Sequence, residues 1–208
     1  EGIITVQLSG FSKYAVIENS NLLLFSDVPR DRWSRDAIYS LTHQNIVNGV
    51  RINGAACFLP ENNITRAEFI KMLTAAIGLD KQELNDVTLP FKDSASIPDW
   101  AAPYVKASWK FGLVNGRADR NGLWADAGKF ITREEACAIL GRTFGDVQPQ
   151  RFYFNDRNSI ADYARKFADV LMELGIFTGY PDNTFRPKNL LTREEAAAII
   201  DRYTRLRD

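Results

Sequence analysis

The stretch "ITRAEF", residues 64–69, recurs as "ITREEA" at 131–136 and as "LTREEA" at 191–196. In each copy a Thr stands three residues before a Glu, which is the capping box of a helix start. The Thr hydroxyl accepts from the N3 amide, and the Glu carboxylate accepts from the N-cap amide. Apolar residues follow each copy at helical spacing. The stretch therefore predicts the same helix start at three places in the chain.

An arginine directly follows each capping Thr, giving Arg66, Arg133 and Arg193. The peptide dipoles make a helix N-terminus partially positive, so a cation is locally unfavourable there. One interpretation is that the arginine and the unpaired amides of the helix start together bind an external carboxylate, which a guanidinium can hold bidentately. The other is that each arginine pairs with a carboxylate of the protein itself, for which the recurrent candidates are Asp27, Asp93 and Asp156.

Longer segments upstream of the three stretches repeat in the same register. They align without gaps as "WSRDAIYSLTHQNIVNG" (33–49), "WAAPYVKASWKFGLVNG" (100–116) and "YARKFADVLMELGIFTG" (163–179). An Asn or Gly followed by an apolar residue predicts a left-handed cap at the end of each first helix, at Asn45, Gly112 and Gly175. Each copy is thus predicted to form helix–loop–helix. Because one such pair cannot bury its apolar stripe alone, the three copies must pack together.

The predicted fold class is all-α, with repeats at residues 22–80, 88–146 and 151–208. Residues 1–21 differ, because they contain two short β-prone runs around "SGFS". These runs predict a β-hairpin that remains from an upstream domain. The chain begins abruptly at "EGIITVQ", so we expect a fragment of a longer protein whose export signal lies upstream.

The composition argues against several function classes. The 208 residues are 45% hydrophobic and 25% charged, with 26 Lys and Arg against 26 Asp and Glu, so net charge offers no route to nucleic acid. No apolar run approaches the roughly 18 residues of a membrane-spanning helix. His43 is the single histidine, and Cys57 and Cys137 lie far apart. We therefore expect neither a metal site nor a disulfide, and both cysteines should be buried fillers.

A catalytic role is also disfavoured. The adjacent carboxylates Glu134–Glu135 and Glu194–Glu195 suggest a glycosidase pair. Neighbours on one helix point about 100° apart, however, and cannot face each other across a glycosidic bond. The turn "PDNTF" lacks the spaced ligands of a calcium loop, and no phosphate-binding glycine loop is present. We therefore expect no enzyme, no catalytic residue and no cofactor.

Together these motifs resemble the S-layer homology (SLH) motif, and three tandem copies are the usual complement of a cell-wall anchoring module. The resemblance covers about residues 25–205, and its most specific parts are the TRAE-like tetrads and the Gly-Tyr-Pro-Asp turn at 179–182. It implies a pseudo-threefold trimer within one chain. The first helices would form a central bundle, the others would project as prongs, and grooves would lie between neighbouring copies. It also implies a monomer in an extracellular location, in the cell wall or S-layer.

The resemblance further implies non-covalent attachment to a peptidoglycan-linked secondary cell wall polymer. This is typically a glycan whose N-acetylmannosamine carries a pyruvate ketal. The arginine of the TRAE-like motif is the family's main ligand for that acidic group, and the role falls on Arg66, Arg133 and Arg193. No membrane insertion is expected. The alternative is a helical-repeat module that binds a partner protein.

Three further sets of residues recur at equivalent places. The glycines either expose backbone amides to a sugar or satisfy a positive φ; they are Gly49, Gly116 and Gly179. The aromatics either form a sugar platform or, as we favour, anchor the core; they are Trp33, Trp100 and Tyr163. The aspartates are expected to brace the loops or to support the groove arginines; they are Asp27, Asp93 and Asp156.

The second copy departs from the pattern in its loop, "GRADRNGLWADAGKF" (116–130). We align its aromatic residue, Trp124, with Phe58 and Phe185 of the other copies, so that Ala125–Asp126 replaces the expected "x-Pro". Trp109 and Trp124 break the repeat pattern, and each is therefore a candidate for a contact specific to the second copy.

Overall fold

The structure is a computed structural model that describes residues 24–79, 83–151 and 153–207. The hairpin predicted at 1–21 lies outside these residues. Three helix–loop–helix units follow one another in the described part, as predicted. Their helices are α1 (Arg35–His43) with α2 (Arg66–Ala76), α3 (Ala102–Lys110) with α4 (Arg133–Gly141), and α5 (Asp162–Glu173) with α6 (Arg193–Arg207). Single 3₁₀ turns lie at Ser94–Ser96, Arg142–Phe144 and Arg157–Ser159.

The helix ends follow their sequence signals. The first helices close on left-handed residues, with φ of 58°, 71° and 69° at Asn45, Gly112 and Gly175. At the start of α2, the Glu68 amide donates to Thr65 Oγ1 at 3.3 Å and the Thr65 amide donates to the Glu68 carboxylate at 2.8 Å. The same two bonds open α4 and α6. All three predicted capping boxes are therefore confirmed.

The first two loops contain short β-hairpins, which the expectation of an all-α fold did not include. β1 (Val50–Ile52) pairs antiparallel with β2 (Ala55–Cys57), and β3 (Arg117–Asp119) pairs with β4 (Gly122–Trp124). Asn53–Gly54 connects the first pair, and Asn121–Gly122 joins the second connection to the first residue of β4. An Asn-Gly dipeptide favours a tight hairpin because both residues accept a positive φ. The described chain is therefore mostly helical with two small hairpins.

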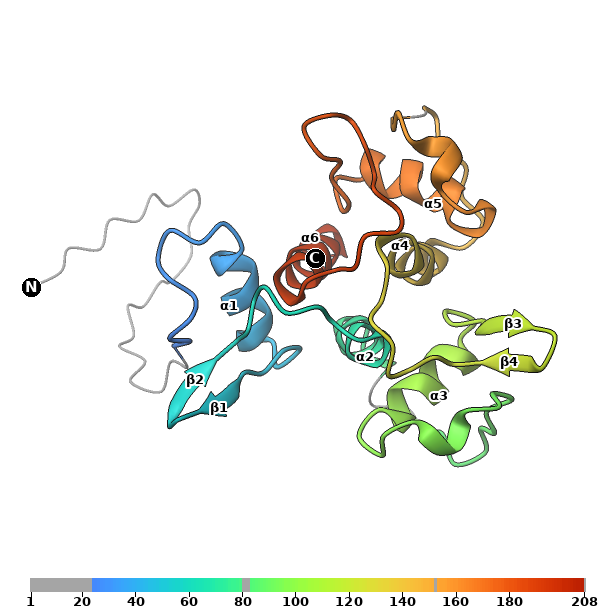
Figure 1. Cartoon of the computed structure of the whole chain (residues 1–208), viewed down its shortest axis with the longest axis horizontal. Coiled ribbons are helices and arrows are strands. Elements are labelled where there is room, and N and C mark those ends of the chain that lie inside the picture. Colours follow the sequence, from blue (N-terminus) through green and yellow to red (C-terminus); the bar gives the residue numbers. More distant parts are fainter. Residues whose placement is uncertain (1–23, 80–82, 152, 208) are drawn as a thin grey trace, which may run out of the picture.

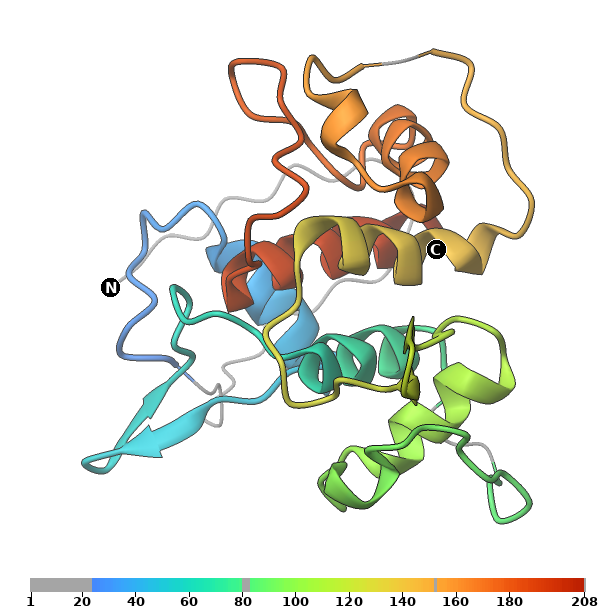
Figure 2. The ribbon, with the colours of Figure 1, turned by 45° about the vertical axis from the view of Figure 1, so that its right-hand side comes forward.

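The second helices of the three copies, α2, α4 and α6, lie side by side at the centre of the molecule, and the first helices lie outside them (Figures 1 and 2). The resemblance placed the first helices at the centre, which is wrong for this chain. The reason is packing between the copies, which leaves every residue of α4 except Glu135 buried, whereas α1 buries only Ile38 and Leu41. A helix that is buried on all sides has to lie in the interior.

Each outer helix packs on the central helix of the preceding copy. α3 packs on α2, α5 packs on α4, and α1 packs on α6, so the first copy closes against the last. The buried apolar side chains of the three copies form one continuous cluster. The copies therefore interleave and share a single core.

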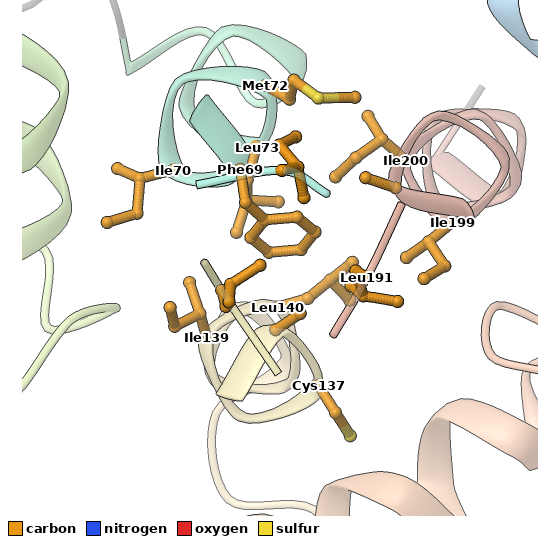
Figure 3. Packing of buried hydrophobic residues seen from close by; sticks show 14 of the residues in the cluster. Phe69, Ile70, Met72, Leu73, Cys137, Ile139, Leu140, Leu191, Ile199 and Ile200 are labelled. Atoms are coloured by element: carbon orange, nitrogen blue, oxygen red, sulfur yellow. The ribbon is translucent and has the colours of Figure 1, made fainter. Parts of the chain in front are cut away.

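One large side chain fills the point where the central helices meet. Phe69 of α2 projects between α2, α4 and α6 (Figure 3). The residues at the equivalent place in the other copies, Ala136 and Ala196, are small, and all three positions are fully buried. Protein interiors are close-packed, so this point accommodates one ring and not three. The three copies are thus alike in backbone but complementary in side-chain size.

A closed ring of backbone hydrogen bonds joins the copies just before the central helices. The Ile64 amide donates to the Leu191 carbonyl, the Leu191 amide to Ile131 and the Ile131 amide to Ile64, at 2.9, 3.0 and 3.1 Å. All three side chains are fully buried. The ring fixes the three helix starts relative to one another and so positions the motif arginines.

Candidate functional site

Three grooves lie between the copies, and each takes residues from all three. The largest, about 490 Å³, is lined by Arg66 of the first copy, the loop of the second copy around Gly116, and Tyr163 of the third. We name it the Arg66 groove.

The other two grooves have the same plan with the copies permuted. The Arg133 groove, about 300 Å³, combines Arg133 with the loop at Gly179 and with Trp33. The Arg193 groove, about 270 Å³, combines Arg193 with the loop at Gly49 and with Trp100. The fold thus brings the predicted arginines, glycines and aromatics together, one of each kind in each groove.

The three aromatic side chains lie on the groove rims. Trp33, Trp100 and Tyr163 are 60%, 49% and 48% exposed, so the favoured interpretation as core anchors was wrong. Each aromatic lies just before an outer helix or in its first turn, where the chain extends beyond the core. An exposed ring beside a polar groove is suited to pack against one face of a sugar.

The glutamate after the motif arginine holds two of these rims in place. Glu194 accepts from Arg32 Nε at 2.8 Å and from Ser34 Oγ at 2.6 Å, next to Trp33. Burial acts to raise the pKa of Glu194, but these hydrogen bonds outweigh it and hold the pKa below its ordinary value.

Glu134 braces the rim of the Arg66 groove in the same manner. It accepts from the Ala161 amide at 3.0 Å and from the Tyr163 hydroxyl at 3.4 Å, and it pairs with Lys188. Burial and the Glu134 charge together raise the pKa of Tyr163 above its ordinary range. The first copy has Ala67 at this position, so no side chain of this type supports Trp100.

Arg133 and Arg193 are held by the loop of the neighbouring copy. Arg133 donates from Nε to the Phe185 carbonyl at 2.8 Å and from Nη2 to the Thr178 carbonyl at 3.0 Å. Arg193 donates from Nε to the Phe58 carbonyl at 2.9 Å. Each guanidinium also lies over the ring of that Phe, 5.1 and 4.9 Å from its centroid. These two arginines therefore brace their loops as well as line a groove.

The carboxylate that faces each motif arginine is the capping-box Glu of the next copy in the cycle. The Nη1–Oε1 distances are 3.9 Å for Arg66–Glu135, 3.9 Å for Arg133–Glu195 and 3.2 Å for Arg193–Glu68. The recurrent aspartates, proposed above as the alternative partners, do not take this role.

The aspartates brace the loops, as predicted. Asp27 accepts from the amides of Phe58 and Leu59 at 2.8 and 2.7 Å. Asp93 and Asp156 each accept two loop amides of their own copies in the same way. Their carboxylates are therefore occupied by the loop backbone.

The starts of the central helices are not open anion sites, although the unpaired amides of a helix start suggested one. The Arg66 and Ala67 amides donate to the carbonyls of Lys129 and Ala127 in the neighbouring copy, at 2.8 and 2.9 Å. The third amide donates to the capping Thr. The first three amides of α4 and α6 are satisfied in the same way. The positively charged groups that line the grooves are therefore side chains and not helix-start amides.

The groove glycines are required for close packing. Each lies against the Phe that begins its copy, and a Cβ on Gly49 would overlap the Phe25 ring. Gly116 alone among the three has a positive φ, 72°, and a Cβ there would lie 2.6 Å from the Phe91 ring. The positive-φ interpretation therefore holds at Gly116 only, whereas at all three positions the adjacent Phe ring leaves little room for a side chain.

Each groove contains a second cation, which the sequence analysis missed. Arg142 lines the Arg66 groove and Arg202 lines the Arg133 groove. Both follow the motif arginine of their own copy at the same spacing, and this recurrence was the available signal. The first copy has Ala75 at that place, and Lys71 lines the Arg193 groove instead. Burial lowers the pKa of Arg142 and of Arg202, and the nearby motif arginine lowers each further.

The structure shifts the alignment of the second copy's loop by one residue. Asp93 accepts from the amides of Ala125 and Asp126 at 2.8 and 2.9 Å, as the equivalent Asp of the other copies does from the Phe and the residue after it. Ala125, and not Trp124, therefore occupies the place of the Phe, and Ala127 occupies that of the Pro. The earlier alignment was wrong because it matched aromatic residues.

The two irregular tryptophans make contacts within the second copy. The Trp124 indole N–H donates to Asp119 within the β3–β4 hairpin at 3.0 Å. Trp109 of α3 packs edge-on against Phe91, with ring centroids 5.3 Å apart. Trp109 thus contacts the copy's leading Phe, as Phe58 and Phe185 do in the other copies.

The part of the chain that the structure describes contains no cluster of His, Cys, Asp and Glu that could hold a metal ion. No described helix is long and apolar enough to cross a bilayer. Cys57 and Cys137 are buried, as predicted for small apolar fillers, and both are free thiols in the structure. Burial raises the pKa of Cys137 well above its ordinary value.

The fold and the grooves define a class of protein: a helical-repeat protein with cationic, aromatic-rimmed grooves between its repeats. The chain belongs to the S-layer homology domain family, whose model matches residues 24–70, 90–121 and 153–197. This confirms the resemblance described above. Domains of this family anchor surface proteins, and membership points to an extracellular, cell wall-associated location.

The chain is similar to parts of longer bacterial proteins. An amylopullulanase of Thermoanaerobacterium thermosulfurigenes is 34% identical over 205 residues, which cover 96% of this chain and 10% of that protein. A cellulosome-anchoring protein of Acetivibrio thermocellus is 30% identical over 150 residues, or 70% of this chain and 33% of its own length. The S-layer protein sap of Bacillus anthracis is 29% identical over 179 residues, or 85% and 20%. The chain thus spans a third or less of each of these relatives.

Proposed function

We propose that this chain is a non-catalytic anchor that binds an acidic secondary cell wall polymer in its grooves, and so attaches a larger protein to the bacterial cell wall. The observation that carries the proposal is the common plan of the grooves. Each combines an arginine, a second cation and an exposed aromatic ring from all three copies. The names of the anchoring and S-layer relatives support the same role.

The chemistry of the grooves suits a sugar that carries a carboxylate. The two groove cations can bind that carboxylate through charge-assisted hydrogen bonds, which are the strong class of such bonds. The rim aromatic packs against the face of the sugar ring, and the loop at the groove glycine faces its hydroxyl groups. A pyruvate ketal on N-acetylmannosamine is an acidic group of this kind. The mechanism requires binding only, and no bond is made or broken.

The three repeats, at residues 22–80, 88–146 and 151–208, are proposed to act as one pseudo-threefold trimer within a monomeric chain. The permuted make-up of the grooves and the closed ring of Ile64, Ile131 and Leu191 support this proposal. Several grooves on one chain allow the same polymer to bind at more than one point, which raises avidity without new contacts.

The direct test is isothermal titration of the chain with purified wall polymer, before and after chemical removal of its ketal pyruvate. The proposal predicts saturable binding that falls at least tenfold when the pyruvate is removed. Equal affinity for both polymers would contradict the role of the carboxylate. Absence of binding to either polymer would contradict the anchoring function and favour a helical-repeat module for a partner protein.

A further inference from the structure

The three grooves differ at the residue that lies beneath the motif arginine. Phe58 and Phe185 fill this place in the Arg193 and Arg133 grooves, where both are fully buried. Ala125 fills it in the Arg66 groove. The groove with the methyl group is also the largest, about 490 Å³ against about 300 and 270 Å³.

The same exchange changes the state of the arginine. Arg66 is only 9% exposed, and its Nε is buried without a hydrogen-bond partner within the described residues. Its nearest carboxylate among the described residues is Glu135, whose Oε1 lies 3.9 Å from Nη1, beyond hydrogen-bond distance, and Asp126 acts on it from farther away in the same groove. Arg133 and Arg193, by contrast, each donate to loop carbonyls and lie over a Phe ring. A buried polar group without a partner costs free energy, so Arg66 gains most from an added acceptor.

A second cation, Arg142, adjoins Arg66. Arg142 lines the same groove and donates one hydrogen bond, from Nη1 to the Leu113 carbonyl at 2.8 Å. The third arginine of this groove, Arg117, is already paired with Asp119 and Asp126, at 3.1 and 2.6 Å. The free positive charge of the groove is therefore concentrated at Arg66 and Arg142.

We propose that the Arg66 groove is the principal binding groove of this chain, that Arg66 and Arg142 together hold the ligand's carboxylate, and that Ala125 makes room for the sugar that bears it. The proposal rests on the function proposed above and deepens it. Arg133 and Arg193 then serve mainly as braces of their loops, and their grooves bind more weakly.

Arg142→Ala and Arg202→Ala form a matched pair for the test. Each arginine follows its motif arginine at the same spacing, and each donates one hydrogen bond to a backbone carbonyl, Leu113 or Ile176. In titrations with the ketal-bearing polymer, we expect Arg142→Ala to lose roughly tenfold or more in affinity, and Arg202→Ala to change it less than about twofold. Equal losses, or a larger loss for Arg202→Ala, would overturn the proposal.

The role of Ala125 is tested by grafting the first copy's residues into the second. Trp109 stands where the first copy has Thr42, so the variant is Ala125→Phe with Trp109→Thr. With helical content unchanged by circular dichroism, we expect a roughly tenfold loss of affinity. Wild-type affinity in this variant would overturn the proposal. If the variant does not fold, the comparison of Arg142→Ala with Arg202→Ala tests the proposal instead. Failure of the wild type to bind polymer would instead count against the proposed function itself.

Discussion

At the residue scale, the three motif arginines share a sequence motif but not a role. The Arg133 guanidinium donates two hydrogen bonds to carbonyls of the neighbouring loop, whereas the Arg66 guanidinium donates none to the described residues, and its Nε is buried without a partner there. Removing a partner from a buried carbonyl is costly, whereas removing a poorly paired buried charge can be neutral or favourable. The same substitution should therefore have different consequences in the two copies.

Replacing each arginine by Met keeps the apolar stem and removes the charge. We expect Arg133→Met to lower the free energy of unfolding by about 2–3 kcal/mol, because two loop carbonyls lose a donor. Arg66→Met should stay within about 1 kcal/mol of the wild type. Urea denaturation followed by circular dichroism measures both, and equal destabilisation would show that Arg66 is as fully bonded as Arg133.

Glu194 gives the protein an acid-sensitive link between α1 and α6. Because its pKa is lowered in the folded state, its contribution to stability is fully present above the ordinary value of 4.5 and is lost as pH falls through the lower folded-state pKa. Glu194→Gln should reduce the loss of stability at acid pH. It should also lower the free energy of unfolding by about 1.5–3 kcal/mol near pH 7.

The measurement for Glu194 is the urea midpoint from pH 7 to pH 3, compared between the variant and the wild type. If the urea midpoint falls equally steeply with pH in both proteins, the acid sensitivity belongs to other carboxylates. Arg32→Ala is the matched control, since it removes the donor rather than the acid and should change the same pH dependence.

At the element scale, the central helices depend on one ring at their meeting point. Phe69→Ala should lower the free energy of unfolding by about 3–5 kcal/mol, because the cavity lies among helices that cannot close around it. The paired variant Phe69→Ala with Ala136→Phe moves the ring to an equivalent place and should recover part of this loss. Thermal and urea denaturation measure the stability of both variants. A paired variant that is less stable than Phe69→Ala would contradict the equivalence of the central helices.

The helix starts and ends could be predicted from the sequence because their signals are local. The capping boxes, the left-handed residues at Asn45, Gly112 and Gly175, and the loop-bracing aspartates all depend on short-range hydrogen bonds. The Asn-Gly dipeptides of the two hairpins are an equally local signal, which the prediction of an all-α fold did not use. Which helix of each pair lies at the centre was not readable, because both carry an apolar stripe and the choice depends on packing between copies.

The sequence predicted most of the residues that line the grooves, but not the contacts that these residues make. The arginines, glycines and aromatics do meet in three grooves, yet the open helix amides were an error, because carbonyls of the neighbouring copy occupy them. Ala125 was misplaced by one residue, since matching Trp124 to a Phe favoured the wrong register. Arg142 and Arg202 recur in only two of the three copies, so the sequence alone did not indicate that they line the grooves.

At the scale of the whole molecule, the interleaved packing makes the three copies depend on one another. α1 packs on α6, so the first copy is completed by the last. A chain truncated after residue 146 should therefore lose cooperative unfolding, because α1 and α4 would each lose the helix that covers them. Circular dichroism melting is the measurement, and a sharp transition in the truncated chain would mean that two copies form an independent core.

The central claim of this account is that the grooves bind a carboxylate-bearing sugar through their arginines, and arginine side-chain NMR tests it most directly. The Nε–Hε signals of the intact chain would be followed while an oligosaccharide of the wall polymer, with its pyruvate ketal, is added. The account predicts that Arg66 and Arg142 shift first and saturate together, and that the ketal-free oligosaccharide leaves them unchanged at the same concentration. Saturable binding in which none of the groove arginines shifts would contradict it.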